Sequence, residues 1–253
     1  MLLALDVGNT NITIGLFRKS RLVRRGRVPT HGSSYIKALG GLLRRFKIAP
    51  VSVDGVIVSS VVPKATLVLK SALKKLVKPR LLILGENVKA PIRNRYRIPR
   101  QVGQDRLVNG VAAWVLYGGP TIVVDFGTAI TIDLISEKQE YLGGLIAPGV
   151  EIALEALSSR AALLPKIRLA RPRELLGRDT VNSMRAGIFY GYGSLCDGIV
   201  RRLKARYAPQ AKVVATGGNV SLIAPFCRTI RVINPDLTLQ GLQIIFSKES
   251  LSR

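Results

Sequence analysis

Apolar and polar positions alternate most regularly in residues 2–17, LLALDVGNTNITIGLF. An apolar run ends at Asp6, a polar turn follows, and apolar residues then alternate with small or polar ones over residues 12–16. A period of two predicts a β-strand, so this segment predicts two strands joined by a tight turn. Gly8 in the turn permits a close backbone approach or a positive φ.

Residues 121–135, TIVVDFGTAITIDLI, repeat this design around Asp125. A carboxylate, backbone N–H groups and hydroxyls at a hairpin tip suit a Mg²⁺-bound phosphate chain. The first segment taken alone fits an ordinary hairpin with Asx-turn chemistry better. Repetition at domain scale is much less expected by chance, so the two hairpins together predict a duplicated domain with a nucleotide between its halves.

The rest of the chain alternates between strand and helix patterns, which predicts an α/β fold. Strands are expected at residues 21–28, 56–60, 80–84, 141–149 and 212–216, and helices at 63–77, from Asp105 onward, at 150–164, at 180–207 and from Ser221. Ser33 or Ser34 is expected to cap a further helix that ends near Phe46. We expect loops at 90–104 and 165–178, and two domains, 1–117 and 118–253.

Four glycines, Gly187, Gly191, Gly193 and Gly198, fall close to one face of the expected helix 180–207. Glycines repeated in this way indicate close helix packing, for example across a dimer interface. A kinked internal helix explains them equally well.

The bulk composition fits a globular protein without a membrane span. The chain has 253 residues, of which 47% are hydrophobic, and no apolar run approaches the ~18 residues of a membrane span. No basic segment precedes an apolar core near residue 1, so we expect no export signal. Cys196 and Cys227 lack metal-site spacing and fit a reducing cytosol, so a cytoplasmic location is expected.

The formal net charge of +24 is unusual, and its basic residues are dispersed along the chain. Such a field attracts anionic ligands, and also nucleic acid without sequence specificity. Aromatic residues make up only 6% of the chain, and no basic strand has the interleaved aromatics of an RNA-binding sheet. We therefore favour a solvated cationic surface.

The motifs DVGNT, GQDR, DFGTA, GGLIAPG and ATGG resemble those of the ASKHA superfamily of actin, Hsp70 and sugar kinases. In their order and spacing, from Leu2 to residues 237–242, they resemble the type III pantothenate kinases, a Bvg accessory factor-like family. The resemblance implies duplicated ribonuclease H-like domains with an interdomain active-site cleft. It implies ATP-dependent phosphorylation of pantothenate to 4'-phosphopantothenate, the first step of coenzyme A biosynthesis.

The resemblance also implies a cytoplasmic homodimer that uses ATP, Mg²⁺ or a similar divalent cation, and K⁺ or NH₄⁺. It makes Asp105 the general base, Asp125 the ligand of the monovalent cation, and Asp6 the residue beside the phosphate-bound divalent cation. ATP contacts are implied for Asp6, Val7, Gly8, Asn9, Thr10, Asn11, Ile12, Thr13 and Thr128. Pantothenate contacts are implied for Tyr96, Gly103, Gln104, Arg106 and Thr180.

Without the resemblance, Asp105 is better explained as a helix-capping carboxylate stabilised by the helix dipole. The resemblance brings three carboxylates, those of Asp6, Asp105 and Asp125, into one cleft. They would repel one another, which gives a physical reason to expect cations there. His31 matches no motif. The segment 96–101 is more basic than expected for a pantothenate site, although the substrate is itself an anion.

Two other functions remain open at this point. One is a nucleic-acid-associated transcriptional accessory factor on the same fold, for which the net charge is the argument. The other is a different ASKHA small-molecule kinase, because a fold alone does not determine the substrate.

Overall fold

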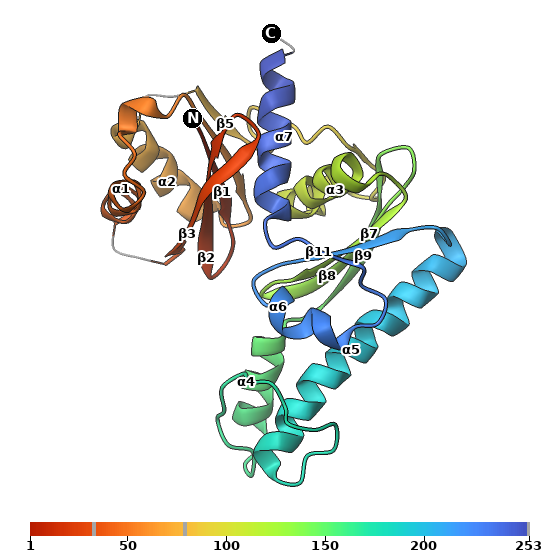
Figure 1. The fold of residues 1–253 in the computed structure, drawn as a ribbon. Helices are drawn as coiled ribbons and strands as arrows, with labels where there is room; N and C mark the ends of the chain where they lie inside the picture. The colour runs from red at the N-terminus through yellow and green to blue at the C-terminus, as the bar shows by residue number, and fades with distance from the viewer. Residues whose placement is uncertain (32–33, 78–79, 252–253) are drawn as a thin grey trace. The chain divides into compact units, whose positions relative to one another are not determined.

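The computed structural model describes residues 1–31, 34–77 and 80–251 (Figure 1). Its contacts divide the chain into two compact units, Met1–Ala112 with Leu237–Arg253, and Ala113–Asp236. The C-terminal helix α7 (Leu237–Leu251) therefore groups with the first unit. The expected domains, 1–117 and 118–253, differ from these units in where they place this helix.

Unit 1 is built on a five-stranded mixed sheet with the order β3-β2-β1-β4-β5. Its strands are β1 (Leu2–Val7), β2 (Asn11–Arg18), β3 (Arg21–Pro29), β4 (Gly55–Ser60) and β5 (Arg80–Ile83). Strand β2 runs antiparallel to β1 and β3, whereas β4 runs parallel to β1 and β5. The carboxyl ends of β1, β4 and β5 consequently meet at one edge of the sheet.

Unit 2 repeats this topology with the order β9-β8-β7-β10-β11. Its strands are β7 (Thr121–Phe126), β8 (Ala129–Ile135), β9 (Glu140–Pro148), β10 (Lys212–Thr216) and β11 (Val232–Ile233). The antiparallel pairs β7–β8 and β8–β9 and the parallel pairs β7–β10 and β10–β11 match those of unit 1 one for one. The predicted α/β duplication is therefore confirmed.

The helices follow the expected positions closely. They are α1 (Tyr35–Arg45), α2 (Pro63–Leu76), α3 (Gln104–Tyr117), α4 (Val150–Arg160), α5 (Thr180–Tyr207) and the single turn α6 (Val220–Ile223). Short 3₁₀ turns lie at η1 (Pro50–Ser52), η2 (Pro99–Gln101) and η3 (Ala224–Phe226), and β6 (Arg93–Asn94) interrupts the first expected loop. Ser34 caps α1 by accepting from Lys37 N, while Ser33 lies outside the described residues.

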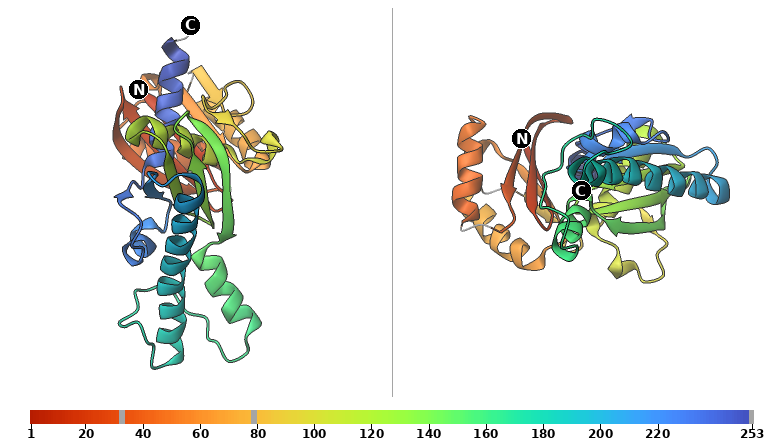
Figure 2. Two further views of the ribbon diagram at one scale, coloured as in Figure 1. Left: turned by 90° about the vertical axis from the view of Figure 1, so that its right-hand side faces the viewer. Right: turned by 90° about the horizontal axis from the view of Figure 1, so that it is seen from below.

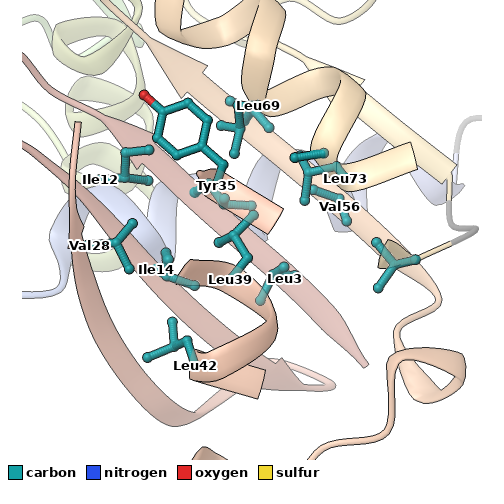
Figure 3. Close-up of a cluster of buried hydrophobic side chains, with 14 of the residues drawn as sticks. Leu3, Ile12, Ile14, Val28, Tyr35, Leu39, Leu42, Val56, Leu69 and Leu73 are labelled. Atoms are coloured by element: carbon teal, nitrogen blue, oxygen red, sulfur yellow. The ribbon is translucent and has the colours of Figure 1, made fainter. Parts of the chain in front are cut away.

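Both faces of the unit 1 sheet are covered by helices. Alternate residues of β1 point to opposite faces, so Leu3 and Leu5 pack with α1 and α2, while Leu2 and Ala4 pack with α3 and α7. Figure 3 shows side chains of the cluster on the side of α1 and α2, to which Leu3 belongs. A sheet buried on both faces holds the strand ends rigidly.

Three expectations about the helices need correction. The helix expected at 150–164 ends at Arg160. The spacing of Ile36 and Val115 along the sequence predicts that they lie on the apolar faces of their helices, but they are 39% and 47% exposed. Helix α7 was not expected, because its apolar residues surround the axis and give no amphipathic stripe. It buries Leu237, Leu239, Leu242 and Ile245.

No helix within the described parts of the chain is long and apolar enough to cross a membrane. The longest helix, α5, runs beside the sheet of unit 2, and its N-terminal part projects beyond that sheet together with α4 (Figures 1 and 2).

Asp197 of α5 holds the segment that follows η3 by hydrogen bonds. Its buried carboxylate accepts hydrogen bonds from Arg228 N at 2.8 Å, Thr229 N at 2.9 Å and Thr229 Oγ1 at 2.7 Å. Burial by itself raises the pKa of Asp197, but these hydrogen bonds and the nearby Arg201 outweigh it, so the pKa lies below its ordinary value. The carboxylate therefore stabilises unit 2 in its charged form.

We predict that Asp197→Ala lowers the free energy of unfolding by ~1–3 kcal/mol at neutral pH, because two backbone N–H groups and one hydroxyl, all partly buried, lose their acceptor. Folding lowers the pKa of Asp197. This contribution is therefore complete above pH ~4, the ordinary pKa of the group, and is lost as the pH falls from there through the lower pKa of the folded state. Urea titrations of both proteins at several pH values measure it. Glu86→Gln, at an exposed carboxylate paired with Lys70, is the control and should change little. A difference that stays constant down to pH ~2 would contradict the assignment.

Candidate active site

The β1–β2 hairpin of unit 1 ends in a compact loop of small polar residues. Gly8 N donates to Asn11 O at 3.0 Å, which closes the loop and leaves Asn9 and Thr10 exposed at its tip. Asp6 lies half-buried at the end of β1, just before this loop. The hairpin predicted from residues 2–17 is thus present, with its carboxylate beside the exposed tip.

Strand pairing sets Asp6 in a row of polar side chains. Asp6 is in register with Thr13 on β2 and with Ser59 on β4, so the three side chains share one face of the sheet. Ser59 is fully buried, and its hydroxyl has no hydrogen-bond partner among the described residues. A buried hydroxyl of this kind calls for a partner such as water or an ion.

The start of α3 lies at the same edge of the sheet. Val61 N donates to Val7 O at 3.1 Å, so the chain leaving β4 stays beside the end of β1. A Cβ at Gly103 would lie 3.5 Å from Val61 Cγ1, and it would collide with Asp105 Oδ1. Gly103 is therefore needed for this approach, and Asp105 stands near the ends of β1 and β4.

Gln104 extends the group toward β5. Its Nε2 lies 3.3 Å from the position of a Cβ at Gly85, the residue at φ +82° that follows β5 and Leu84. Gly103, Gln104 and Asp105 thus lie along the carboxyl edge of β1, β4 and β5. In open α/β sheets ligands bind outside this edge.

Asp105 and Arg106 occupy the first turn of α3. Asp105 is half-buried, and its Oδ1 accepts from Arg106 N at 2.9 Å, within the first turn of the helix, where the helix dipole stabilises a carboxylate. Arg106 is 6% exposed. The carboxylate is held by its own helix and stays accessible in part.

The segment before α3 carries Tyr96, whose backbone N donates to Asn94 Oδ1 at 3.0 Å. Four exposed arginines surround it in sequence, Arg93, Arg95, Arg97 and Arg100. Their positive field favours an anionic ligand near this segment.

The second predicted hairpin lies in unit 2, with Asp125 half-buried at the end of β7 and Thr128 exposed at the tip. Gly217, which follows β10 at φ +100°, lies against it: a Cβ there would collide with Asp125 Oδ1 and come within 2.6 Å of Phe126 N. A Cβ at Gly149 would collide with Thr128 O. Two glycines therefore let neighbouring segments close around the hairpin.

Thr180, by contrast, is exposed at the start of α5, directly after the capping residue Asp179. The N-terminal part of α5, which begins at Thr180, projects beyond the sheet of unit 2 (Figures 1 and 2).

Sequence reasoning missed two features of these sites. Ser59 reads as part of an apolar strand, and only its register with Asp6 makes it conspicuous. Gly217 appeared in the sequence only as part of the ATGG motif, and the structure adds its contact with Asp125. Its place directly after a strand was the available signal.

The comparisons with known proteins identify the family. The model of the type III pantothenate kinase family matches residues 2–202. The chain belongs to the type III pantothenate kinase family. A type III pantothenate kinase from Moorella thermoacetica is 46% identical over 254 residues, covering 99% of this chain and 100% of its own length.

Solved structures agree on the fold of this type III pantothenate kinase family member. Component A of (R)-2-hydroxyglutaryl-CoA dehydratase from Acidaminococcus fermentans matches with TM-score 0.58 and 11% identity over 98% of both chains. The ROK hexokinase of Thermus thermophilus matches with TM-score 0.50 and 16% identity over 100% of this chain and 99% of its own. These likenesses confirm the ASKHA fold.

Membership of the type III pantothenate kinase family also establishes the reaction. The chain is an ATP-using kinase that phosphorylates pantothenate in coenzyme A biosynthesis, as the sequence motifs predicted.

Proposed function

We propose that Asp105 is the general base of this kinase and that the β1–β2 loop holds the phosphates of ATP. The observation that supports this most directly is the shared edge of the unit 1 sheet, where two separate stretches of chain bring together Asp6 at the end of β1 and Gly103 and Asp105 at the start of α3. A base and a phosphate site on one rigid edge are what transfer from ATP to an alcohol requires.

The transfer needs little covalent help from protein. The hydroxyl oxygen of pantothenate forms a bond to the γ-phosphorus, the bond from that phosphorus to the bridging oxygen breaks, and ADP leaves. Asp105 accepts the hydroxyl proton. Arg106 helps to hold pantothenate, and Tyr96, Gly103 and Gln104 line its site. Thr180 is proposed as a further contact from the family resemblance alone.

ATP contacts are proposed for the loop residues 6–13 and for Thr128 of the second hairpin. Backbone N–H groups at a glycine-containing turn suit phosphate oxygens. Thr128, exposed at its hairpin tip, is available to a nucleotide.

The donor set beside β1 fits a divalent cation such as Mg²⁺. Mg²⁺ is commonly held by one or two carboxylates, substrate phosphates and several waters. Asp6 would supply the carboxylate, and the buried hydroxyl of Ser59 in the same row would bond to a water of the ion. When bound, the ion neutralises charge on the phosphates.

The second hairpin fits a monovalent cation, K⁺ or NH₄⁺, at Asp125. The close approach of Gly217 to the Asp125 carboxylate brings the backbone that follows β10 to the same point as this side chain. Carboxylate and carbonyl oxygens together are suitable ligands for a hard cation. The bound ion would neutralise the charge of the Asp125 carboxylate.

The kinase is further proposed to act as a cytoplasmic homodimer through one face of α5. A Cβ at Gly187, Gly191 or Gly198 would meet nothing within 4 Å, whereas Gly193 packs against Phe226. The open glycines recur at spacings of four and seven residues and therefore share a face with Leu195, which is 38% exposed. A stripe of this kind permits close approach of a second helix.

The test of Asp105 is its replacement by asparagine, which removes the base but keeps the shape of the side chain. We expect Asp105→Asn to lower kcat by about 10²–10⁴ while ATP binding, measured by calorimetry, is retained. Glu86→Gln, at an exposed carboxylate of the same unit, is the control and should leave kcat unchanged. Turnover like that of the wild type in Asp105→Asn would remove Asp105 from this role.

The monovalent site is tested by titrating K⁺ into enzyme held in Na⁺ buffer and measuring ADP release. We expect activity to require K⁺ or NH₄⁺. Gly217→Ala should raise the K⁺ concentration for half-maximal activity by about tenfold, because the new Cβ displaces the Asp125 carboxylate and the adjoining backbone of Phe126. Gly40→Ala, whose Cβ makes only an ordinary contact 3.7 Å from Leu76 Cδ2, is the control. Full activity in Na⁺ alone, or an unchanged K⁺ dependence in Gly217→Ala, would count against the assignment.

The dimer is tested by Gly191→Glu, which places a charge on the open face of α5. Sedimentation should report a dimer for the wild type and a monomer for this variant, because an unpaired charge at a buried interface is costly. Lys138→Glu, in the exposed turn between β8 and β9, should leave the dimer intact. A dimer in both variants would locate the interface elsewhere.

A further inference from the structure

Thr30 joins the end of β3 to the loop of the β1–β2 hairpin. Strand β3 runs antiparallel to β2 and pairs Pro29 with Asn11, so the residue after β3 arrives beside the loop. Thr30 Oγ1 donates to Gly8 O at 2.6 Å, and Thr30 N donates to Thr10 O at 3.0 Å. One residue, 2% exposed, thus binds two carbonyl groups of the loop.

Thr30 is itself held by the core of unit 1. The phenol of Tyr35, the first residue of α1, donates to Thr30 O. Tyr35 is 7% exposed, and its ring lies in the cluster of buried side chains that contains Ile12, Val28 and Leu39 (Figure 3). The helix and the loop are therefore connected through two hydrogen-bonding side chains.

These bonds determine the direction of N–H groups in the loop. A trans peptide is planar, and its C=O and N–H point in opposite directions. Because Gly8 O and Thr10 O point to Thr30, the N–H groups of Asn9 and Asn11 point away from it. Thr30 thus turns two donors of the loop toward the side opposite β3.

We propose that Thr30 and Tyr35 are positioning residues that set the loop donors for the phosphates of ATP. This inference rests on the proposed role of the loop as the phosphate site. Neither residue touches the reacting atoms. Their effect is to keep the peptide planes of the loop in the binding orientation before the nucleotide arrives, which lowers the cost of ordering on binding.

The experiment compares Thr30→Val, which removes the hydroxyl at nearly constant volume, with Thr30→Ser, which keeps it. Thr30→Val should raise the KM for ATP by about tenfold, change the KM for pantothenate by less than about twofold, and reduce the rise in Tm produced by ATP. Thr30→Ser should keep the KM for ATP and the rise in Tm produced by ATP close to those of the wild type. Tyr35→Phe keeps the ring in the core and should act in the same direction with a smaller effect.

Val53→Ala is the matched control for a loss of stability alone. Val53 is 4% exposed and belongs to the same core cluster, but it lies before β4, at the end of the sheet opposite the loop. It should leave the ratio of the two KM values unchanged. An unchanged KM for ATP in Thr30→Val, or equal increases in both KM values, overturns the proposal.

Gly8→Ala separates this proposal from the one on which it rests. A Cβ at Gly8 would lie 3.3 Å from Asn11 O, so it stands in the loop itself and the Asn11 carbonyl must give by a few tenths of an ångström. If Gly8→Ala raises the KM for ATP and Thr30→Val does not, the role of Thr30 is wrong and the phosphate site stands. If Gly8→Ala has no effect, the loop is not the phosphate site, and both proposals fail.

Discussion

Backbone pairing of β1 with β2 on one side and β4 on the other is the constraint on which unit 1 depends. The antiparallel partner returns the chain as a hairpin and sets Thr13 beside Asp6, and the parallel partner sets Ser59 on its other side. Side chains alternate along a strand, so a slip of one residue would turn Asp6 into the core. Apolar burial on both faces of the sheet prevents that slip.

The same pairing recurs in unit 2, with different consequences. In unit 1 the hairpin loop is held by a hydroxyl from the chain that leaves β3. In unit 2 the hairpin is instead approached by Gly217 after β10 and by Gly149 after β9. The same topology thus supports two different hairpins. The β1–β2 loop is held by a hydrogen bond from Thr30, and the Asp125 hairpin is closely approached by two glycines. Duplication of a fold leaves each copy free to specialise its loops.

The strands and most helices were predictable because their signals are local. Alternation over residues 12–16 and 130–134 identifies the hairpins, and Ser34 and Asp179 are recognisable helix caps. Helix α7 was not predictable in this way, because it is buried on several sides and lacks an amphipathic pattern. The position of Ser59 beside Asp6 and the hydrogen bond from Thr30 to Gly8 depend on strand register, which no local sequence pattern encodes. The candidate catalytic residues came from the resemblance, since Asp105 alone has the form of a capping residue.

Helix α7 makes unit 1 discontinuous along the chain. Leu239, Leu242 and Ile245 belong to the core that also contains Leu2, Ala4 and Ile57, yet unit 2 lies between them in sequence. During synthesis the ribosome releases unit 2 before the residues that complete unit 1 have been made. Unit 1 must therefore leave part of one apolar face of its sheet uncovered until α7 has been made, whereas the whole sequence of unit 2 is available earlier. A protein truncated before residue 237 would retain both hairpins. It would lack the helix that helps to cover one face of the unit 1 sheet, to which the β1–β2 hairpin belongs.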